Sequence, residues 1–116
     1  MSDAKAIKFF QEILNKTRTA RIRWEPTAEE AQFVAAIGGQ FTVLTSAEDR
    51  RNTWGERYTV YSLVLRDEPG RSLIEVTSLD DGIQEAAARE LYELSRRQAL
   101  RVDNKIDQLL GELERL

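Results

Sequence analysis

An apolar residue recurs every three or four positions, with one interval of five, through residues 83–116 of this 116-residue chain. That spacing is typical of one stripe along an amphipathic helix. A helix of about 33 residues is on the order of 50 Å long, whereas a nine-residue strand spans about 30 Å. An unbroken helix would therefore extend beyond a sheet that it covers. Its stripe consists of Ile83, Ala87, Leu91, Leu94, Ala99, Val102, Ile106, Leu109, Leu113 and Leu116.

The far end of this stripe is a candidate interaction surface, because its spacing resembles a short coiled-coil seam. Such a seam has to be covered by the first helix or by another chain. The first helix is short and must also cover the sheet, so we expect a homodimer in which two seams pack together. The alternative is a break near residues 100–102, with Asp103 capping a separate last helix that folds back on its own sheet. The seam residues are Ile106, Leu109, Leu113 and Leu116.

The front of the chain predicts a helix that is capped by Ser2 or Asp3 and ends between residues 15 and 17. Strands are predicted over residues 21–25, 33–37, 41–45, 58–66 and 72–76. Gly38-Gly39 favours a hairpin turn between the second and third of these strands, although a helix over residues 28–37 is the alternative. Residues 46–57 are predicted to form a long polar connection, and Pro69-Gly70 a type II turn. The helical stripe of the front segment is Ile7, Phe10, Ile13 and Leu14.

This order of elements predicts one α+β domain over residues 1–116. It has an N-terminal helix, an antiparallel meander sheet of four to five strands and a long C-terminal helix. Packing helices on one side of the sheet is the simplest way to bury the apolar faces. No linker or repeat indicates a domain boundary.

Composition excludes several classes of function. The chain has no His and no Cys, which excludes disulfides, thiolate chemistry and His-based catalysis or metal binding. We therefore expect no catalytic residue, no cofactor and no metal site. There is no span of about 18 apolar residues and no signal-peptide pattern, so we expect no membrane association and a cytoplasmic location.

The polar connection contains a second candidate interaction site. Trp54 lies among basic residues, including Arg57, and Trp and Arg are enriched at interface hot spots. A loop tryptophan can equally fold back onto its own core. Trp24 shares a predicted strand face with Ile22 and is expected in the core.

A basic run offers the alternative of a nucleic-acid or nucleotide-binding module. Four cations fall within eight residues, directly before Trp24, and such a run can bind phosphates. The competing interpretation is a solvated helix end and sheet edge, which the net charge of −3 favours. The residues of this basic run are Lys16, Arg18, Arg21 and Arg23.

Both ends of the chain resemble a group of small uncharacterised bacterial proteins. At the front the likeness is carried by Lys16-Thr17, Ile22, Trp24 and Thr27, and at the end by residues 91–100, Val102-Asp103, Ile106-Asp107 and Leu109-Leu110. These are packing residues, so the resemblance implies a compact bacterial domain and no activity. We therefore expect a non-enzymatic protein that acts by binding another protein, with homodimerisation through the last helix.

Overall fold

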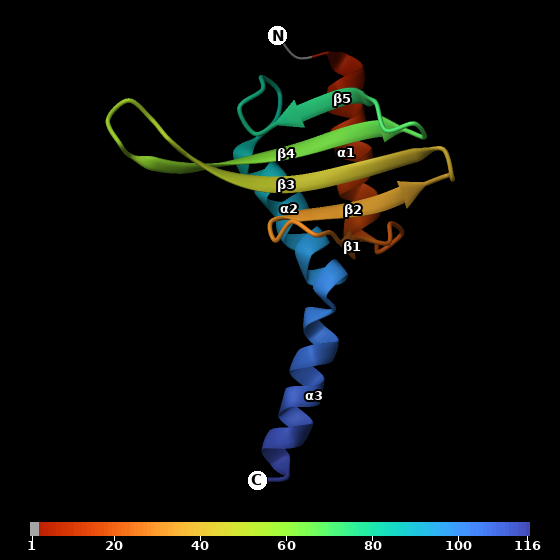
Figure 1. The fold of residues 1–116 in the computed structure, drawn as a ribbon, viewed down its shortest axis with the longest axis vertical. Helices are drawn as coiled ribbons and strands as arrows, with labels where there is room; N and C mark the ends of the chain where they lie inside the picture. The colour runs from red at the N-terminus through yellow and green to blue at the C-terminus, as the bar shows by residue number, and fades with distance from the viewer. Residues whose placement is uncertain (1–2) are drawn as a thin grey trace.

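The computed structural model describes residues 3–116 and confirms the predicted α+β class (Figure 1). One helix precedes five strands, and two helices follow them. The elements are α1 (Ala4–Arg18), β1 (Glu25–Pro26), β2 (Gln32–Ile37), β3 (Phe41–Arg51), β4 (Arg57–Asp67), β5 (Ser72–Thr77), α2 (Glu85–Leu100) and α3 (Val102–Glu114).

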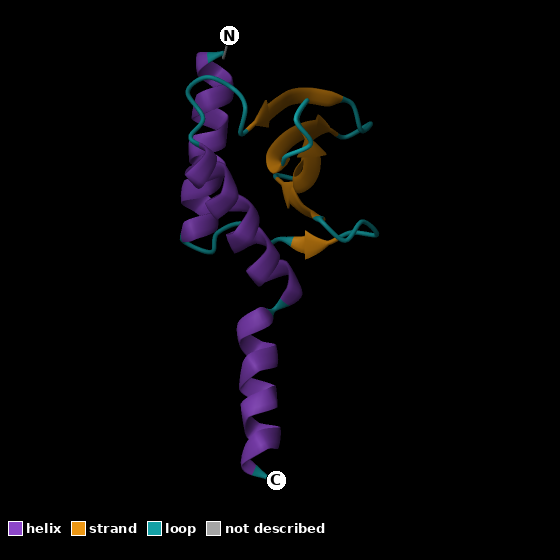
Figure 2. Cartoon of the chain, turned by 90° about the vertical axis from the view of Figure 1, so that its left-hand side faces the viewer, coloured by secondary structure: helices purple, strands orange, loops and turns teal. Residues whose placement is uncertain are grey.

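The five strands form an antiparallel meander in the order β1-β2-β3-β4-β5. Helices α1 and α2 lie together on one face of this sheet, as predicted (Figure 2). Alternate strand residues point to that face, and with the two helices they form the hydrophobic core. The core comprises Phe10, Ile13, Leu14, Ile22, Trp24, Phe33, Ala35, Val43, Leu63, Val76, Ile83, Ala88, Leu91, Tyr92 and Ala99.

Helix α1 begins and ends with capping interactions. The Asp3 carboxylate accepts the backbone N–H of Lys5 at 2.9 Å, whereas the alternative cap, Ser2, lies outside the described residues. At the other end Ala20 adopts a left-handed conformation (φ 58°). The N–H groups of Ala20 and Arg21 bond back to the carbonyls of Thr17 and Lys16, which is the Schellman arrangement.

The connection from α1 to the sheet differs from the prediction. Only Glu25 and Pro26 pair with β2, so the predicted strand over residues 21–25 is wrong for its first four positions. The alternation there reflects burial instead, because Ile22 and Trp24 are both buried. The Trp24 indole N–H donates to the hydroxyl of Thr17 on α1 at 3.1 Å, which holds the segment against the helix rather than in the sheet.

Two turn predictions have opposite outcomes. The hairpin around Gly38-Gly39 is confirmed, since both glycines have positive φ (63° and 74°), and the alternative helix over residues 28–37 is wrong. The predicted type II turn is also wrong. The N–H of Gly70 bonds to the carbonyl of Asp67 at 2.9 Å, which makes Gly70 the fourth turn residue. The Asp67 carboxylate also accepts the N–H of Arg71 at 2.8 Å and fixes this geometry.

Residues 46–57, predicted as a connection, are mostly strand. β3 and β4 stay paired as far as Arg51 and Arg57, beyond the last residues that pair with β2 and β5. We call residues 49–59 the arm. It projects well past the neighbouring strands in Figure 1.

The C-terminal helical segment is broken. Arg101 has φ 53° and ψ 48°, which ends α2 and starts α3. The expectation of an unbroken helix is therefore wrong, and the alternative break is correct in position. Asp103 does not cap the last helix as expected, because α3 already begins at Val102 with Arg101 as its N-cap, and Asp103 lies in the first turn. However, α3 does not fold back on the sheet but points away from it (Figure 1). Together the arm and α3 explain a radius of gyration of 16.0 Å, against about 13 Å for a compact domain of similar length.

Candidate protein interaction surfaces

Helix α3 presents the largest unpartnered apolar stripe. It has no buried residue, and the exposed fractions of its aliphatic side chains are 44% for Ile106, 57% for Leu109 and 51% for Leu113. Leu116, just after the helix, is 99% exposed. The structure thus places Ile106, Leu109 and Leu113 on one helix, with Leu116 two residues beyond its end, and leaves these four predicted seam residues without cover within the described chain. Leu110 adds a fifth exposed aliphatic residue beside them, at 51%.

The elbow between α2 and α3 is held by polar contacts. The Arg97 guanidinium donates to the Asp103 carboxylate across the break. Beside this pair lies an open hollow of about 330 Å³, lined by Leu94, Arg97, Gln98, Arg101, Asp103 and Asn104. These contacts fix the start of α3 but cover none of its apolar stripe.

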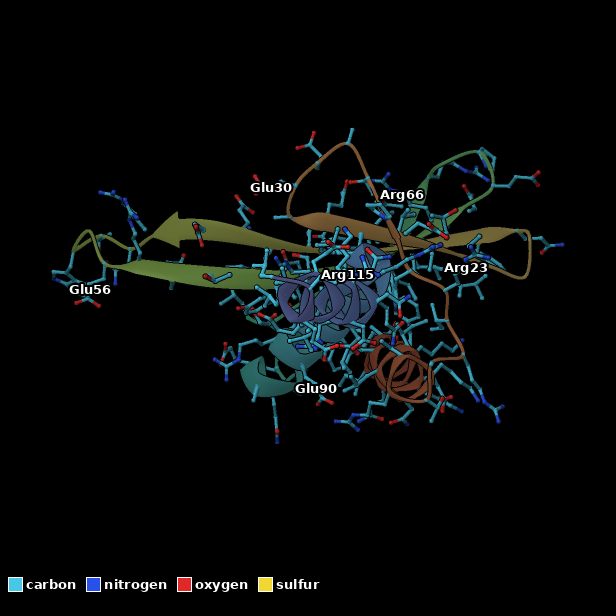
Figure 3. The ribbon with its side chains drawn as sticks, turned by 90° about the horizontal axis from the view of Figure 1, so that it is seen from below. Arg23, Glu30, Glu56, Arg66, Glu90 and Arg115 are labelled. Atoms are coloured by element: carbon cyan, nitrogen blue, oxygen red, sulfur yellow. The ribbon has the colours of Figure 1, made fainter. Side chains whose placement is uncertain are left out.

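The tip of the arm projects Trp54 into solvent. Its exposed fraction is 83%, so the alternative in which Trp54 folds back onto the core is wrong. The side chain of Asn52 builds the tip, since its carbonyl oxygen accepts the N–H groups of Trp54 (2.9 Å) and Glu56 (3.0 Å). Figure 3 shows Glu56 at the far end of the arm, distant from the helices.

Two arginines face each other beside this tip. Arg51 and Arg57 are direct cross-strand partners, an arrangement that is unfavourable for like charges. Their neighbour Arg50 is paired with Glu48 at 3.1 Å. The arm therefore presents an exposed indole at its tip, with two cross-strand arginines at the base of that tip.

The basic run is partly neutralised. Arg18 makes two hydrogen bonds to Glu90 of α2, at 2.6 and 2.7 Å, and this bonding lowers the pKa of the Glu90 carboxyl. Arg23 pairs with Glu25 at 2.9 Å. Two of the four cations, Arg18 and Arg23, are thus paired with carboxylates. The other two, Lys16 and Arg21, are exposed at the end of α1.

Sequence reasoning missed three features of these surfaces. Leu110 lies one position outside the heptad spacing, and only the exposure of the whole helix identifies it. Arg51 and Arg57 are partners because β3 and β4 stay paired up to these two residues. A predicted turn over residues 52–56, shorter than the predicted connection over residues 46–57, would have placed them opposite each other. The left-handed conformation of Arg101 carries no sequence signal, because Gly is the usual residue there.

No group of three Asp or Glu side chains within residues 3–116 is arranged to hold a metal ion. No helix in the same residues is both long and apolar enough to cross a membrane. Comparisons of the chain with protein-family models, curated proteins and solved structures find no match. Function is therefore inferred from the surfaces themselves.

Proposed function

We propose that this chain is a non-enzymatic interaction protein that binds another protein through α3, and that a second copy of the chain is its partner. The observation that carries the proposal is the exposure of α3. A thirteen-residue helix without a single buried residue projects from a well-packed body and exposes an aliphatic stripe. Stripes with heptad spacing are typical of helices that pack against another helix.

Covering the apolar stripe of α3 is energetically favourable. Fully burying a Leu or Ile side chain contributes about 1.5–3 kcal/mol. In the stripe, Ile106, Leu109 and Leu113 are about half exposed and Leu116 is almost fully exposed. Covering them would contribute several kcal/mol for each chain, which is large beside a typical domain stability of about 5–15 kcal/mol. α1 packs on α2 and β5, and no element within residues 3–116 covers α3, which supports a second copy of the chain as the cover.

The test is the oligomeric state of two matched double variants. Ile106→Asp with Leu113→Asp places two charges in the stripe, and we expect a monomer by sedimentation equilibrium or light scattering. Asn104→Asp with Gln108→Asp places the same charges on the opposite side of α3 and should leave the dimer intact. A 13.3 kDa monomer for the unmodified protein at high concentration would refute self-association.

The arm tip supports a contact with a different protein. Trp54 combines high exposure with the nearby Arg51 and Arg57, which make no ion pair within residues 3–116, and Trp and Arg are enriched at interface hot spots. For an identified partner, Trp54→Ala should weaken binding by about 2 kcal/mol. The same variant should leave self-association through α3 unchanged, because the arm and α3 project in different directions (Figure 1). An unchanged partner affinity in calorimetry would exclude the arm tip as a contact.

The alternative function, nucleic-acid binding through the basic run, has weaker support. Arg18 and Arg23 already hold carboxylates, so fewer cations are available for phosphates. Phosphate-driven binding falls steeply as salt rises. Anisotropy titrations of labelled duplex and single-stranded oligonucleotides at two salt concentrations would separate this function from protein binding.

A further inference from the structure

We infer that α3 pairs with α3 of a second copy in the antiparallel direction, and that ion pairs between Lys105 and the partner's Glu112 set the register. This inference rests on the proposed function and specifies its geometry. It follows from where the charged residues of α3 lie relative to the apolar stripe.

The two flanks of the stripe differ in chemistry. Val102, Ile106, Leu109, Leu113 and Leu116 follow one another at intervals of four, three, four and three residues. Lys105 and Glu112 each directly precede a stripe residue, so they lie on the same flank, two turns apart. The opposite flank carries Asp103 and Leu110. One flank thus bears two opposite charges seven residues apart, and the other bears one acid and one aliphatic residue.

The direction of pairing decides which flanks meet. In a parallel pair the symmetry axis runs along the helices, so each flank meets the opposite flank of its partner, and Lys105 would lie against Leu110. In an antiparallel pair the symmetry axis is perpendicular to the helices, so each flank meets the same flank of the partner helix. Only the antiparallel direction therefore brings Lys105 and Glu112 of two chains together. It also sets the two helix dipoles side by side in opposite directions, which is favourable.

The charges also select one register. When Lys105 lies opposite the partner's Glu112, the reciprocal pair forms by symmetry. In the same register Ile106 packs against the partner's Leu109. A slip of one heptad in one direction sets Glu112 against the partner's Glu112, and a slip in the other direction sets Lys105 against the partner's Lys105. Both slips replace two attractive pairs by a like-charge pair.

Both charged groups are available for this role. The Lys105 ammonium is exposed and makes no side-chain hydrogen bond or ion pair within residues 3–116. The Glu112 carboxylate accepts from Arg115 at 2.9 Å in an exposed pair. Exposed pairs of this kind contribute little, and a carboxylate has a second oxygen that can accept from the partner's Lys105.

Charge reversal tests the register. Lys105→Glu and Glu112→Lys each turn two attractive pairs into two repulsive ones, and each should raise the dimer Kd about tenfold. The double variant restores opposite charges at both contacts and should return the Kd to near its original value. Gln108→Lys and Gln108→Glu change the charge of α3 by one unit outside the flank, and they should have much smaller effects.

Cysteine cross-linking tests the direction, and the absence of Cys from the chain makes each introduced thiol unique. In the antiparallel register Val102 lies across from the partner's Leu113. Chains with Val102→Cys mixed with chains with Leu113→Cys should then form a disulfide heterodimer. Leu113→Cys alone should not cross-link, because its two copies would be about 16 Å apart along the helices, beyond the reach of a disulfide.

The outcomes separate the register from the function. A dimer whose Kd does not change on charge reversal, or that cross-links through Leu113→Cys alone, overturns the antiparallel register. Neither result contradicts self-association through α3. A dimer that is insensitive to Ile106→Asp with Leu113→Asp, or a protein that stays monomeric, overturns the proposed function as well. Loss of affinity in both single variants with recovery in the double variant supports the inference.

Discussion

The two tryptophans occupy opposite environments, and this sets a direct comparison at the scale of single residues. Trp24 is 3% exposed and hydrogen-bonded to Thr17, whereas Trp54 is 83% exposed. Trp24→Ala should therefore lower the free energy of unfolding by about 3–5 kcal/mol. Trp54→Ala should change it by no more than about 0.5 kcal/mol. Chemical denaturation of both variants checks this, and a large loss of stability in Trp54→Ala would mean that the arm tip packs on the body.

Ala20 is a second residue whose conformation has a measurable cost. Its left-handed backbone at the end of α1 is unfavourable for any residue with a Cβ. Ala20→Gly should raise the free energy of unfolding by about 1 kcal/mol. Ala86 lies in the first turn of α2 with a helical conformation, so Ala86→Gly should instead lower stability, by up to about 1 kcal/mol. Two shifts of the same sign in urea denaturation would contradict this explanation.

At the scale of elements, the arm depends on its tip rather than on a core. Asn52→Ala removes the acceptor for two backbone N–H groups, so the ends of β3 and β4 should open more often. We expect faster tryptic cleavage after Arg51 and Arg57, with global stability changed by no more than about 0.5 kcal/mol. Asn104→Ala on α3 is the control and should leave cleavage of the arm unchanged. Cleavage of the arm at the original rate in Asn52→Ala would show that the strands hold the tip without that side chain.

The same element explains the limits of prediction from the sequence. Predictions that rest on burial patterns were correct for the stripe of α1 and for the apolar strands of the body, because these residues face the core. The Gly38-Gly39 hairpin was also predicted correctly, and it connects two of those strands. Residues 49–57 of the arm lie outside the body, where both strand faces meet water, so they lack the alternation that identifies a strand. The apolar period runs through Arg101 without interruption, so it predicts the stripe of α3 but cannot show that the helix breaks there. The candidate seam was therefore predictable, and the break near Arg101 could be given only as an alternative. The outward direction of α3 and the Arg51–Arg57 pair were not predicted.

At the scale of the whole molecule, a group of aromatic rings joins the sheet to α2, with Phe33 and Tyr92 buried and Tyr61 partly buried. Tyr92 packs against Tyr61 and Phe33, with ring centroids 5.6 and 5.7 Å apart. Burial raises the pKa of the Tyr61 and Tyr92 phenols above the ordinary value. The folded state therefore favours their protonated forms. This contribution to stability is complete below the unfolded pKa of about 10 and is lost as the pH rises through the folded pKa.

Thermal denaturation between pH 8 and 11 measures this loss. Stability should be nearly constant at first and then fall above about pH 10. Tyr92→Phe removes one of the two phenols and should make the fall shallower. Identical slopes for Tyr92→Phe and the original protein would mean that the buried ring does not contribute.

The lack of buried residues in α3 has a kinetic consequence. A helix of thirteen residues is near the length at which isolated helices become marginal in water, so in a single copy its backbone hydrogen bonds should open almost freely. Partner binding would then order the helix as well as cover its stripe. Amide hydrogen exchange in α3 should therefore slow as protein concentration rises, whereas exchange in the central part of β4 should not. The folded fraction of α3 would in this way depend on the concentration of the protein.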